Sequence, residues 1–192
     1  ANCYINNNPF TNAEITAGII YIVRDPRDVT CSASKHFDLS LEETKNVLLD
    51  RSAQTIARKN IDHEITTFLG SWSDNYNSWK SFNKKVLVMK YEDLVLKKKD
   101  SILRLVEFLN LFFPLKINKQ KLENCLRTTS FKYLSSMEES EGFGESVSSK
   151  DEKKIQFFNK GLVGNWKNIL SPKISNEIEI NFKNEMTELG YF

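Results

Sequence analysis

The sequence has no apolar run that approaches the roughly 20 residues needed for a helix to cross a bilayer. The longest run, Ala17 to Val23, stops at Arg24. Nor is there an excess of charge of one sign, because 27 basic residues face 25 acidic ones and the net charge is +2. We therefore expect no membrane association and no nucleic-acid partner. Any anion that the protein binds must be held by a local site.

Cysteine and histidine are also scarce, with three cysteines at wide spacing, no C-x-x-C pair and two histidines. This composition predicts no metal site and indicates reduced thiols in a cytoplasmic protein. Residues 1–8 lack an initiator Met and the basic and apolar regions of a signal peptide. We expect that the natural chain begins upstream of Ala1.

The residues that are present predict one globular domain over residues 1–192, since 40% are hydrophobic and 27% charged. Ala17 to Val23 is rich in β-branched residues, which is typical of a strand buried on both faces in a parallel sheet. Lys85 to Lys90 is a second strand, and helical patterns separate the two. The fold class is therefore α/β. Because a sheet usually has about 4 to 6 strands, we expect further strands upstream.

Helix-start signals follow the first strand directly. Asp25 can be the N-cap and Pro26 the first helical residue, while Asp28 can return a hydrogen bond as in a capping box. This pattern predicts a helix over residues 26–37. Further helices are predicted over 41–50, 53–68, 71–82 and the stretch that contains Ile102, Leu105, Val106 and Leu109.

Three aromatic residues, Trp72, Tyr76 and Trp79, share one face of a predicted helix. By default such a stripe packs in the core, and lining an apolar acceptor pocket is the alternative. Lys97 to Lys99 reads as a solvated helix start.

Residues 135–154 are polar and contain two glycines. This composition predicts a long mobile loop. It could be a surface excursion, but it directly precedes a glycine-containing motif, so we favour an active-site lid.

Two segments have the chemistry of anion sites. Arg24 follows a buried strand where the next helix presents free N–H groups and the positive end of its dipole, and Ser32 lies two turns further on. The alternative is that Arg24 pairs with an acid such as Asp28. In the second segment, Lys160 supplies a charge and Gly161 lets backbone N–H groups approach an oxyanion. Without the Walker A order, this motif is weak alone.

Taken together, four stretches resemble the cytosolic-type sulfotransferases, which transfer a sulfuryl group from 3'-phosphoadenosine-5'-phosphosulfate (PAPS) to a hydroxyl or amine and leave 3'-phosphoadenosine-5'-phosphate (PAP). The resemblance covers nearly the whole chain. The stretches are Tyr21 to Val29 with Ser32 and His36-Phe37, Gly70-Ser-Trp72 with Trp79, Val88 to Leu94 with its Y-E-D-L, and Lys160 to Asn168 with its K-G-x-x-G-N-W-K-N.

The resemblance implies a P-loop NTPase-like parallel sheet flanked by helices, PAPS as donor, no metal, and a small-molecule acceptor with a hydroxyl or amine. It also implies roles for seven residues: Arg24, Ser32, Lys160 and Gly161 at the 3'-phosphate, and Tyr91, Thr129 and Phe131 around the adenine. These residue types suit their ligands, because a phosphate favours Arg, Lys and backbone N–H donors while adenine favours an aromatic plane.

The chain departs from the family pattern in three places. Asn159 stands where the family usually has Arg, and Ser171-Pro172 with Asn176 replaces its short dimerisation segment, so oligomeric state stays open. Two features of the family match nothing in this sequence: its first strand, with the lysine that binds the phosphosulfate, and its general-base histidine. The catalytic residues are therefore unassigned. His36 matches a structural histidine better than a substitute base, and His63 lies in a charged stretch. We therefore expect the 192 residues to be the C-terminal part of the enzyme, and inactive alone.

Two other functions fit part of the pattern. A P-loop nucleotide kinase shares the α/β sheet and anion-binding loops, but the sequence shows neither Walker A nor a magnesium-binding acid after a strand. A non-catalytic module that holds a 3',5'-bisphosphonucleotide or a partner protein would need only the binding residues.

Overall fold

The computed structural model describes residues 4–5, 8–54, 67–82, 84–143, 147–148, 154–158 and 161–192. The described strands are β1 (Tyr4–Ile5), β2 (Asn8–Pro9), β3 (Gly18–Val23), β4 (Lys85–Lys90), β5 (Val147–Ser148) and β6 (Lys154–Ile155). The described helices are α1 (Pro26–Phe37), α2 (Leu41–Leu49), α3 (Trp72–Lys80), α4 (Tyr91–Leu96), α5 (Lys98–Leu109), α6 (Lys119–Thr128), α7 (Phe131–Glu141), the 3-10 helix η1 (Asn165–Asn168), α8 (Pro172–Asn181) and α9 (Lys183–Glu188).

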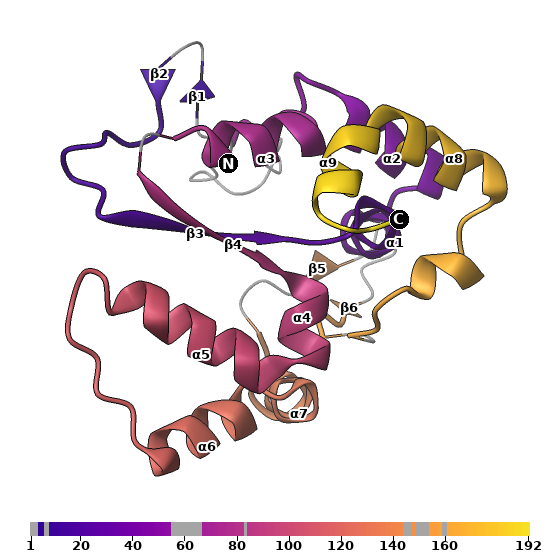
Figure 1. Ribbon diagram of the computed structural model, residues 1–192. Coiled ribbons are helices and arrows are strands. Elements are labelled where there is room, and N and C mark those ends of the chain that lie inside the picture. Colours follow the sequence, from indigo (N-terminus) through magenta and orange to yellow (C-terminus); the bar gives the residue numbers. More distant parts are fainter. Residues whose placement is uncertain are drawn as a thin grey trace.

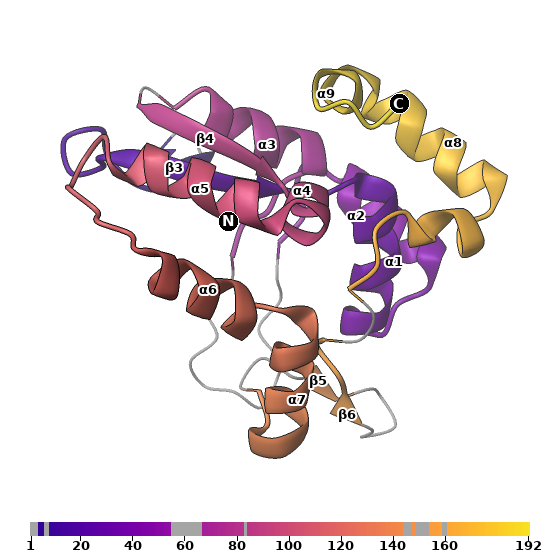
Figure 2. The ribbon, with the colours of Figure 1, turned by 60° about the horizontal axis from the view of Figure 1, so that its bottom comes forward.

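The two predicted strands, β3 and β4, form a parallel pair from Gly18 opposite Lys85 to Val23 opposite Lys90. Helix α3 packs on one side of this pair and α5 on the other (Figure 1). Helices α1 and α2 lie beyond the carboxyl end of β3 (Figure 2). This arrangement confirms the α/β prediction, and it leaves the ends of both strands facing the same space.

Burial on both faces of β3 was expected, and that expectation is wrong in this structure. Ile19 and Val23 are buried, but Ile20 and Ile22 are 42% and 57% exposed. The reason is that α5 packs against β4, which leaves part of the β3 face uncovered. The β-branched composition indicated a strand but not how much of it is covered.

Local signals explain helix α1 well. The Asp25 carboxylate accepts a hydrogen bond from the Arg27 backbone N–H at 2.9 Å, and Pro26 is the first helical residue. The helix ends where Asp38 adopts the left-handed conformation, with a φ of 53°. The predicted boundaries, residues 26–37, are therefore confirmed. Helix α2 begins with a capping box formed by Ser40 and Glu43.

Two other predicted segments differ from the structure. At the ends of the expected helix over 53–68, Gln54 and Phe68 instead form an isolated antiparallel bridge. The Ala53 carbonyl accepts from the backbone N–H groups of Leu69 and Gly70 at 2.8 and 2.9 Å, which draws the two ends together. Residues 55–66, with His63, lie outside the described residues.

The expected loop over 135–154 is helical in its first part, since α7 runs to Glu141. Ser130 caps this helix by accepting from the Tyr133 backbone N–H at 3.3 Å. Polar composition was misleading here, because Met and Glu are good helix formers and Ser costs little. Beyond it, β5 and β6 pair antiparallel. The role of the segment as a lid stays a prediction.

The aromatic stripe on α3 packs in the core, as the default interpretation holds. Tyr76 is 2% exposed and stacks on Trp72, with ring centroids 6.4 Å apart. Trp72 also packs against Phe182, which belongs to a buried cluster of α8 and α9 with Ile174, Ile178 and Met186. Trp79 packs on the second buried cluster, which contains Ile19 and Phe82.

A buried arginine holds the C-terminal helices against α1. Arg27 pairs with Asp25 at 2.7 Å and with Glu179 of α8 at 2.6 Å, and it donates to the Tyr191 carbonyl at 2.7 Å. Burial alone would lower the pKa of Arg27, but the hydrogen bonds with the two carboxylates raise it. Its guanidinium carbon lies 4.0 Å from the centroid of the Trp166 ring.

No helix among the described residues is long and apolar enough to cross a membrane.

Candidate functional site

The site begins where β3 and β4 end. Because Val23 is paired with Lys90, the next residues, Arg24 and Tyr91, emerge side by side. The guanidinium carbon of Arg24 lies 4.4 Å from the centroid of the Tyr91 ring, within the range of a cation–π contact. The strand register therefore sets the position of a cation over an aromatic ring.

The Arg24 guanidinium has one nitrogen with a hydrogen-bond partner and one without. Its Nη2 donates to the Leu162 carbonyl at 3.0 Å, which ties the strand end to the glycine-containing loop. Its Nε is buried and has no hydrogen-bond partner among the described residues. An unpaired buried donor is unfavourable by about 1 to 3 kcal/mol, so this atom is suited to an acceptor that arrives with a ligand.

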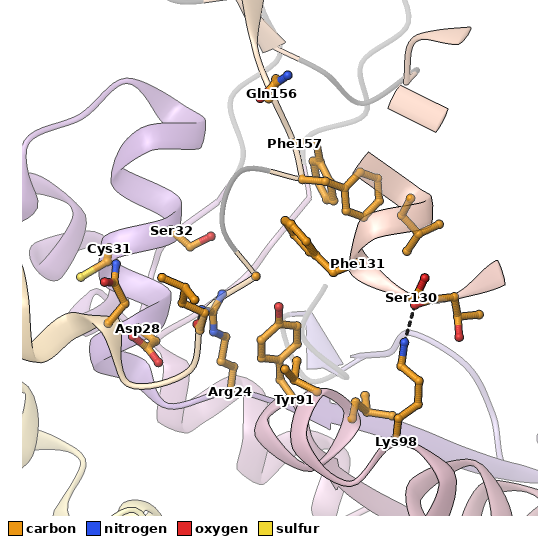
Figure 3. A pocket seen from close by; sticks show the side chains of 18 of the residues that line it. Arg24, Asp28, Cys31, Ser32, Tyr91, Lys98, Ser130, Phe131, Gln156 and Phe157 are labelled. Carbon is orange, nitrogen blue, oxygen red and sulfur yellow. Dashed lines mark hydrogen bonds between the residues drawn. The ribbon is translucent and has the colours of Figure 1, made fainter. Parts of the chain in front are cut away.

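A cavity of about 890 Å³ opens around Arg24. Its walls come from the carboxyl ends of the strands, α1, α4, α5, α6, the start of α7 and the loop before η1. In Figure 3 the side chains of Arg24, Tyr91 and Phe131 converge on this space, with Ser32 on α1 facing them.

Six of the seven predicted site residues line this one cavity: Arg24, Ser32, Tyr91, Thr129, Phe131 and Gly161. They come from four segments of the chain, around Arg24 and Ser32, Tyr91, Thr129 and Phe131, and Gly161. The seventh, Lys160, lies outside the described residues, as does Asn159. The fold therefore brings the predicted residues together, and their roles toward a ligand stay predictions.

Asp28 does not act as predicted. It neither pairs with Arg24 nor completes a capping box. Its carboxylate, 1% exposed, accepts from the backbone N–H groups of Gly164 and Trp166 at 2.7 and 2.9 Å. The loop before η1 offers these two N–H groups within reach, whereas the first turn of α1 is already capped by Asp25. Asp28 thus fixes that loop to α1.

Glu92, the acid of the Y-E-D-L segment, holds the other strand end. It accepts from the Asp25 backbone N–H and from the Tyr191 hydroxyl, both at 3.0 Å. Burial and the neighbouring Glu92 carboxylate raise the pKa of Tyr191 above its usual value, so this hydroxyl remains a donor. The start of α1, the start of α4 and the C-terminus are thereby joined behind Arg24.

The opposite wall is formed where α6 meets α7. The Thr129 hydroxyl donates to the Cys125 carbonyl at 2.7 Å, so toward the cavity this oxygen can only accept. Lys98 Nζ donates to the Thr129 carbonyl at 2.5 Å. The sequence predicted only a solvated helix start at Lys97 to Lys99, and it did not indicate the contact of Lys98. Nothing in that run distinguishes Lys98 from its neighbours, because its partner is 31 residues away.

Gly161 lies directly against the Phe131 ring. A Cβ at Gly161 would come within 2.4 to 2.9 Å of three ring carbons, and the residue has a φ of +58°. Both features require glycine. The predicted phosphate-side backbone and the predicted adenine-side ring are therefore in contact.

His36 and Cys31 also line the cavity. The His36 ring packs edge-on against Phe37 and Phe157, with centroid distances of 4.8 and 5.9 Å, which favours the structural interpretation. Burial raises the pKa of the Cys31 thiol to about 11, so it stays protonated at neutral pH. Among the described residues, no three His, Cys, Asp or Glu side chains gather where they could hold a metal ion.

Comparison with known proteins finds matches over most of the chain. Residues 10–190 match the family model for the sulfotransferase domain. The chain is 28% identical to sulfotransferase 2A1 of Macaca fascicularis over 177 residues, which cover 90% of this chain and 58% of the relative. It is 27% identical to sulfotransferase 1E1 of Bos taurus over 180 residues, covering 93% and 58%. The chain thus spans little more than half the length of these relatives.

Solved structures show the same fold. The chain aligns with mouse sulfotransferase SULT7A1, crystallised with PAP, at a TM-score of 0.59 and 23% identity, covering 88% of this chain and 58% of that protein. Retinol dehydratase, crystallised with androsterone and PAP, aligns at a TM-score of 0.60 and 20% identity, covering 88% and 47%. At these identities the likeness concerns the fold.

Proposed function

We propose a function for this chain, which belongs to the sulfotransferase domain family. The protein transfers a sulfuryl group from PAPS to a hydroxyl or amine of a small-molecule acceptor. The chain described here would supply the nucleoside and 3'-phosphate half of the donor site. The observation that carries the proposal is the convergence of Arg24, Ser32, Tyr91, Phe131 and Gly161 on one cavity.

The residues present suit the donor nucleotide. The unpartnered Arg24 Nε needs an acceptor, and a 3'-phosphate oxygen is a strong one. The Ser32 hydroxyl and the Gly161 backbone lie on the same cavity, and Lys160 precedes that glycine in the sequence. We assign these four residues to the 3'-phosphate. The presence of PAP in two structures of the same fold supports this assignment.

The adenine would lie against the aromatic side of the cavity. The Phe131 ring offers a stacking face, and the Thr129 hydroxyl can accept one hydrogen bond from an amino group. The Arg24 guanidinium lies over the Tyr91 ring, so Tyr91 would keep that cation positioned toward the phosphate. Adenine and phosphate would then be bound by neighbouring walls.

PAPS, when bound, supplies an activated sulfuryl group that an acceptor oxygen or nitrogen can attack in line. The residues of this chain would contribute by orientation, because a donor held at its nucleoside end presents its other end in a fixed direction. We propose no metal requirement, and a cytoplasmic location, which agrees with the name cytosolic sulfotransferase carried by related Arabidopsis thaliana proteins.

A turnover assay tests the proposal. The natural protein that contains this chain and the 192 residues alone are each incubated with PAPS and a panel of hydroxylated and amine acceptors, and the release of PAP is measured. We expect acceptor-dependent release from the natural protein and none from the 192 residues alone, in which neither the phosphosulfate-binding lysine nor the general-base histidine of the family is matched. PAP binding by the natural protein without release in any acceptor mixture would favour the non-catalytic binding module instead, and failure to bind either nucleotide would contradict the proposal.

A further inference from the structure

Helix α7 carries a buried carboxylate that the functions described above do not use. Glu138 is 3% exposed, whereas Glu139 and Glu141 on the same helix are exposed. A carboxylate is rarely buried unless strong donors surround it. Here the donors are the backbone N–H groups of Phe157 and Phe158, which give hydrogen bonds of 2.8 Å each to its two oxygens.

Phenylalanine rings gather beside this contact. Phe143 lies 4.9 Å from Phe157 and 5.3 Å from Phe158 between ring centroids, and Phe131 lies 6.4 Å from Phe158. Because Glu138 is only 3% exposed, a hydrogen bond to its charge is stronger than one in water, and a missing one is more unfavourable. The contact therefore holds the segment before the glycine-containing loop firmly to α7.

Helix α7 and the segment that contains Phe157 and Phe158 lead to two neighbouring parts of the cavity wall. Helix α7 begins with Phe131, and Gly161 follows Phe158 by three residues in the sequence and lies on the Phe131 ring. We infer that Glu138 is a positioning residue, which ties Phe157 and Phe158 to α7 so that the Gly161 backbone stays on the Phe131 ring. The inference rests on the proposed function in so far as this junction is assigned to the nucleotide.

A carboxylate is the side chain that this position requires. Glutamine has the same length but only one acceptor oxygen, and its amide N–H₂ would face one of the two backbone donors. Alanine removes both acceptors of these N–H groups. The effects should therefore be graded, with alanine more severe than glutamine.

The test compares Glu138→Ala and Glu138→Gln with the matched controls Glu139→Ala and Glu139→Gln, which change an exposed neighbour on the same helix. Two quantities are measured: amide hydrogen exchange at Phe157 and Phe158 without nucleotide, and the Kd for PAP by calorimetry. We expect Glu138→Ala to speed exchange and weaken PAP binding by about tenfold each. Glu138→Gln should have smaller effects of the same sign, and the Glu139 variants should match the wild type.

Unchanged exchange at Phe157 and Phe158 in both Glu138 variants would overturn the inference, as would faster exchange with an unchanged Kd for PAP. If Glu138→Ala does not fold, Glu138→Gln decides both points, because it keeps one of the two acceptors. A wild-type protein that fails to bind PAP would count against the proposed function, while the exchange measurement would still judge the tie between Glu138 and the loop.

Discussion

Asp28 shows how an acidic side chain can line a cavity that we propose to bind an anion. Its carboxylate accepts hydrogen bonds from the backbone N–H groups of Gly164 and Trp166, and the residue is 1% exposed. The Arg24 guanidinium instead contacts Leu162 and Tyr91 and lines the cavity. Of these two residues, four positions apart, Asp28 fixes the loop and Arg24 is the one that we propose to bind the ligand.

Replacing Asp28 by Asn should lower the free energy of unfolding by about 1 to 3 kcal/mol, because one of the two backbone donors loses its acceptor in a buried place. Urea denaturation followed by fluorescence measures the loss. Asp100→Asn is the control, since Asp100 is an exposed aspartate in the first turn of α5, and it should change the free energy of unfolding by no more than about 1 kcal/mol. Equal effects of the two substitutions would contradict the assigned role of Asp28.

The sequence predicted the place of Arg24 at the cavity but not the contacts of Asp28, and the reason is the range of those contacts. Arg24 is recognisable because it follows a strand and precedes a helix, which is a local pattern. The partners of Asp28 lie 136 and 138 residues away, so only the folded chain reveals them. The sequence pattern also allowed a local capping box, but the Asp28 carboxylate instead accepts from two backbone N–H groups far away in the sequence.

At the scale of the elements, the loop that leads into η1 contains two glycines in the left-handed region. Gly161 and Gly164 both have positive φ angles, of 58° and 73°. They differ in their surroundings, because a Cβ at Gly161 would meet the Phe131 ring while a Cβ at Gly164 would meet nothing within 4 Å. This pair separates backbone strain from contact with α7.

Gly164→Ala should therefore lower the free energy of unfolding by about 1 kcal/mol, because only the strain of a positive φ is added. Gly161→Ala should show that strain together with displacement of Phe131, and should weaken PAP binding more than Gly164→Ala does. Calorimetric titration of PAP into both variants measures the difference. Equal affinities would mean that the contact between Gly161 and Phe131 is irrelevant to the nucleotide.

Elements were predictable where their signals are local. The start of α1 follows from Asp25 and Pro26, and the parallel pair of β3 and β4 follows from two β-branched runs separated by helices. The segment around Gln54 and Phe68 was not predictable, because its bridge and the bonds to the Ala53 carbonyl join residues far apart in sequence. Helix α7 was partly hidden by serines and glutamates that composition alone assigns to a loop.

At the scale of the molecule, buried ion pairs join segments from both halves of the chain. Arg27 links α1 to α8 and to the C-terminal carbonyl of Tyr191, and Lys45 of α2 pairs with Glu177 of α8. This assembly also contacts the loop that lines the cavity, because Arg27 lies on the ring of Trp166, whose backbone N–H donates to Asp28.

Arg27→Ala should be strongly destabilising, by about 3 to 5 kcal/mol, because it leaves the buried Asp25 carboxylate without its partner. Arg51→Ala is the matched control, since its pair with Asp74 is at the surface, with the Arg51 side chain 84% exposed, and should change stability by no more than about 1 kcal/mol. Urea midpoints of both variants give the comparison. A loss for Arg27→Ala as small as that for Arg51→Ala would show that the pairs with Asp25 and Glu179 are dispensable.

We propose that Arg24 binds the 3'-phosphate of the nucleotide, and calorimetric titration of PAP and of adenosine 5'-phosphate into the wild type and Arg24→Ala measures that contact. The variant should lose about 2 to 4 kcal/mol of binding free energy for PAP, because a charge-assisted donor is removed. Its affinity for adenosine 5'-phosphate, which has no 3'-phosphate, should barely change. Equal losses for both nucleotides would contradict the claim, because Arg24 would then act only by holding Leu162 and Tyr91 in place.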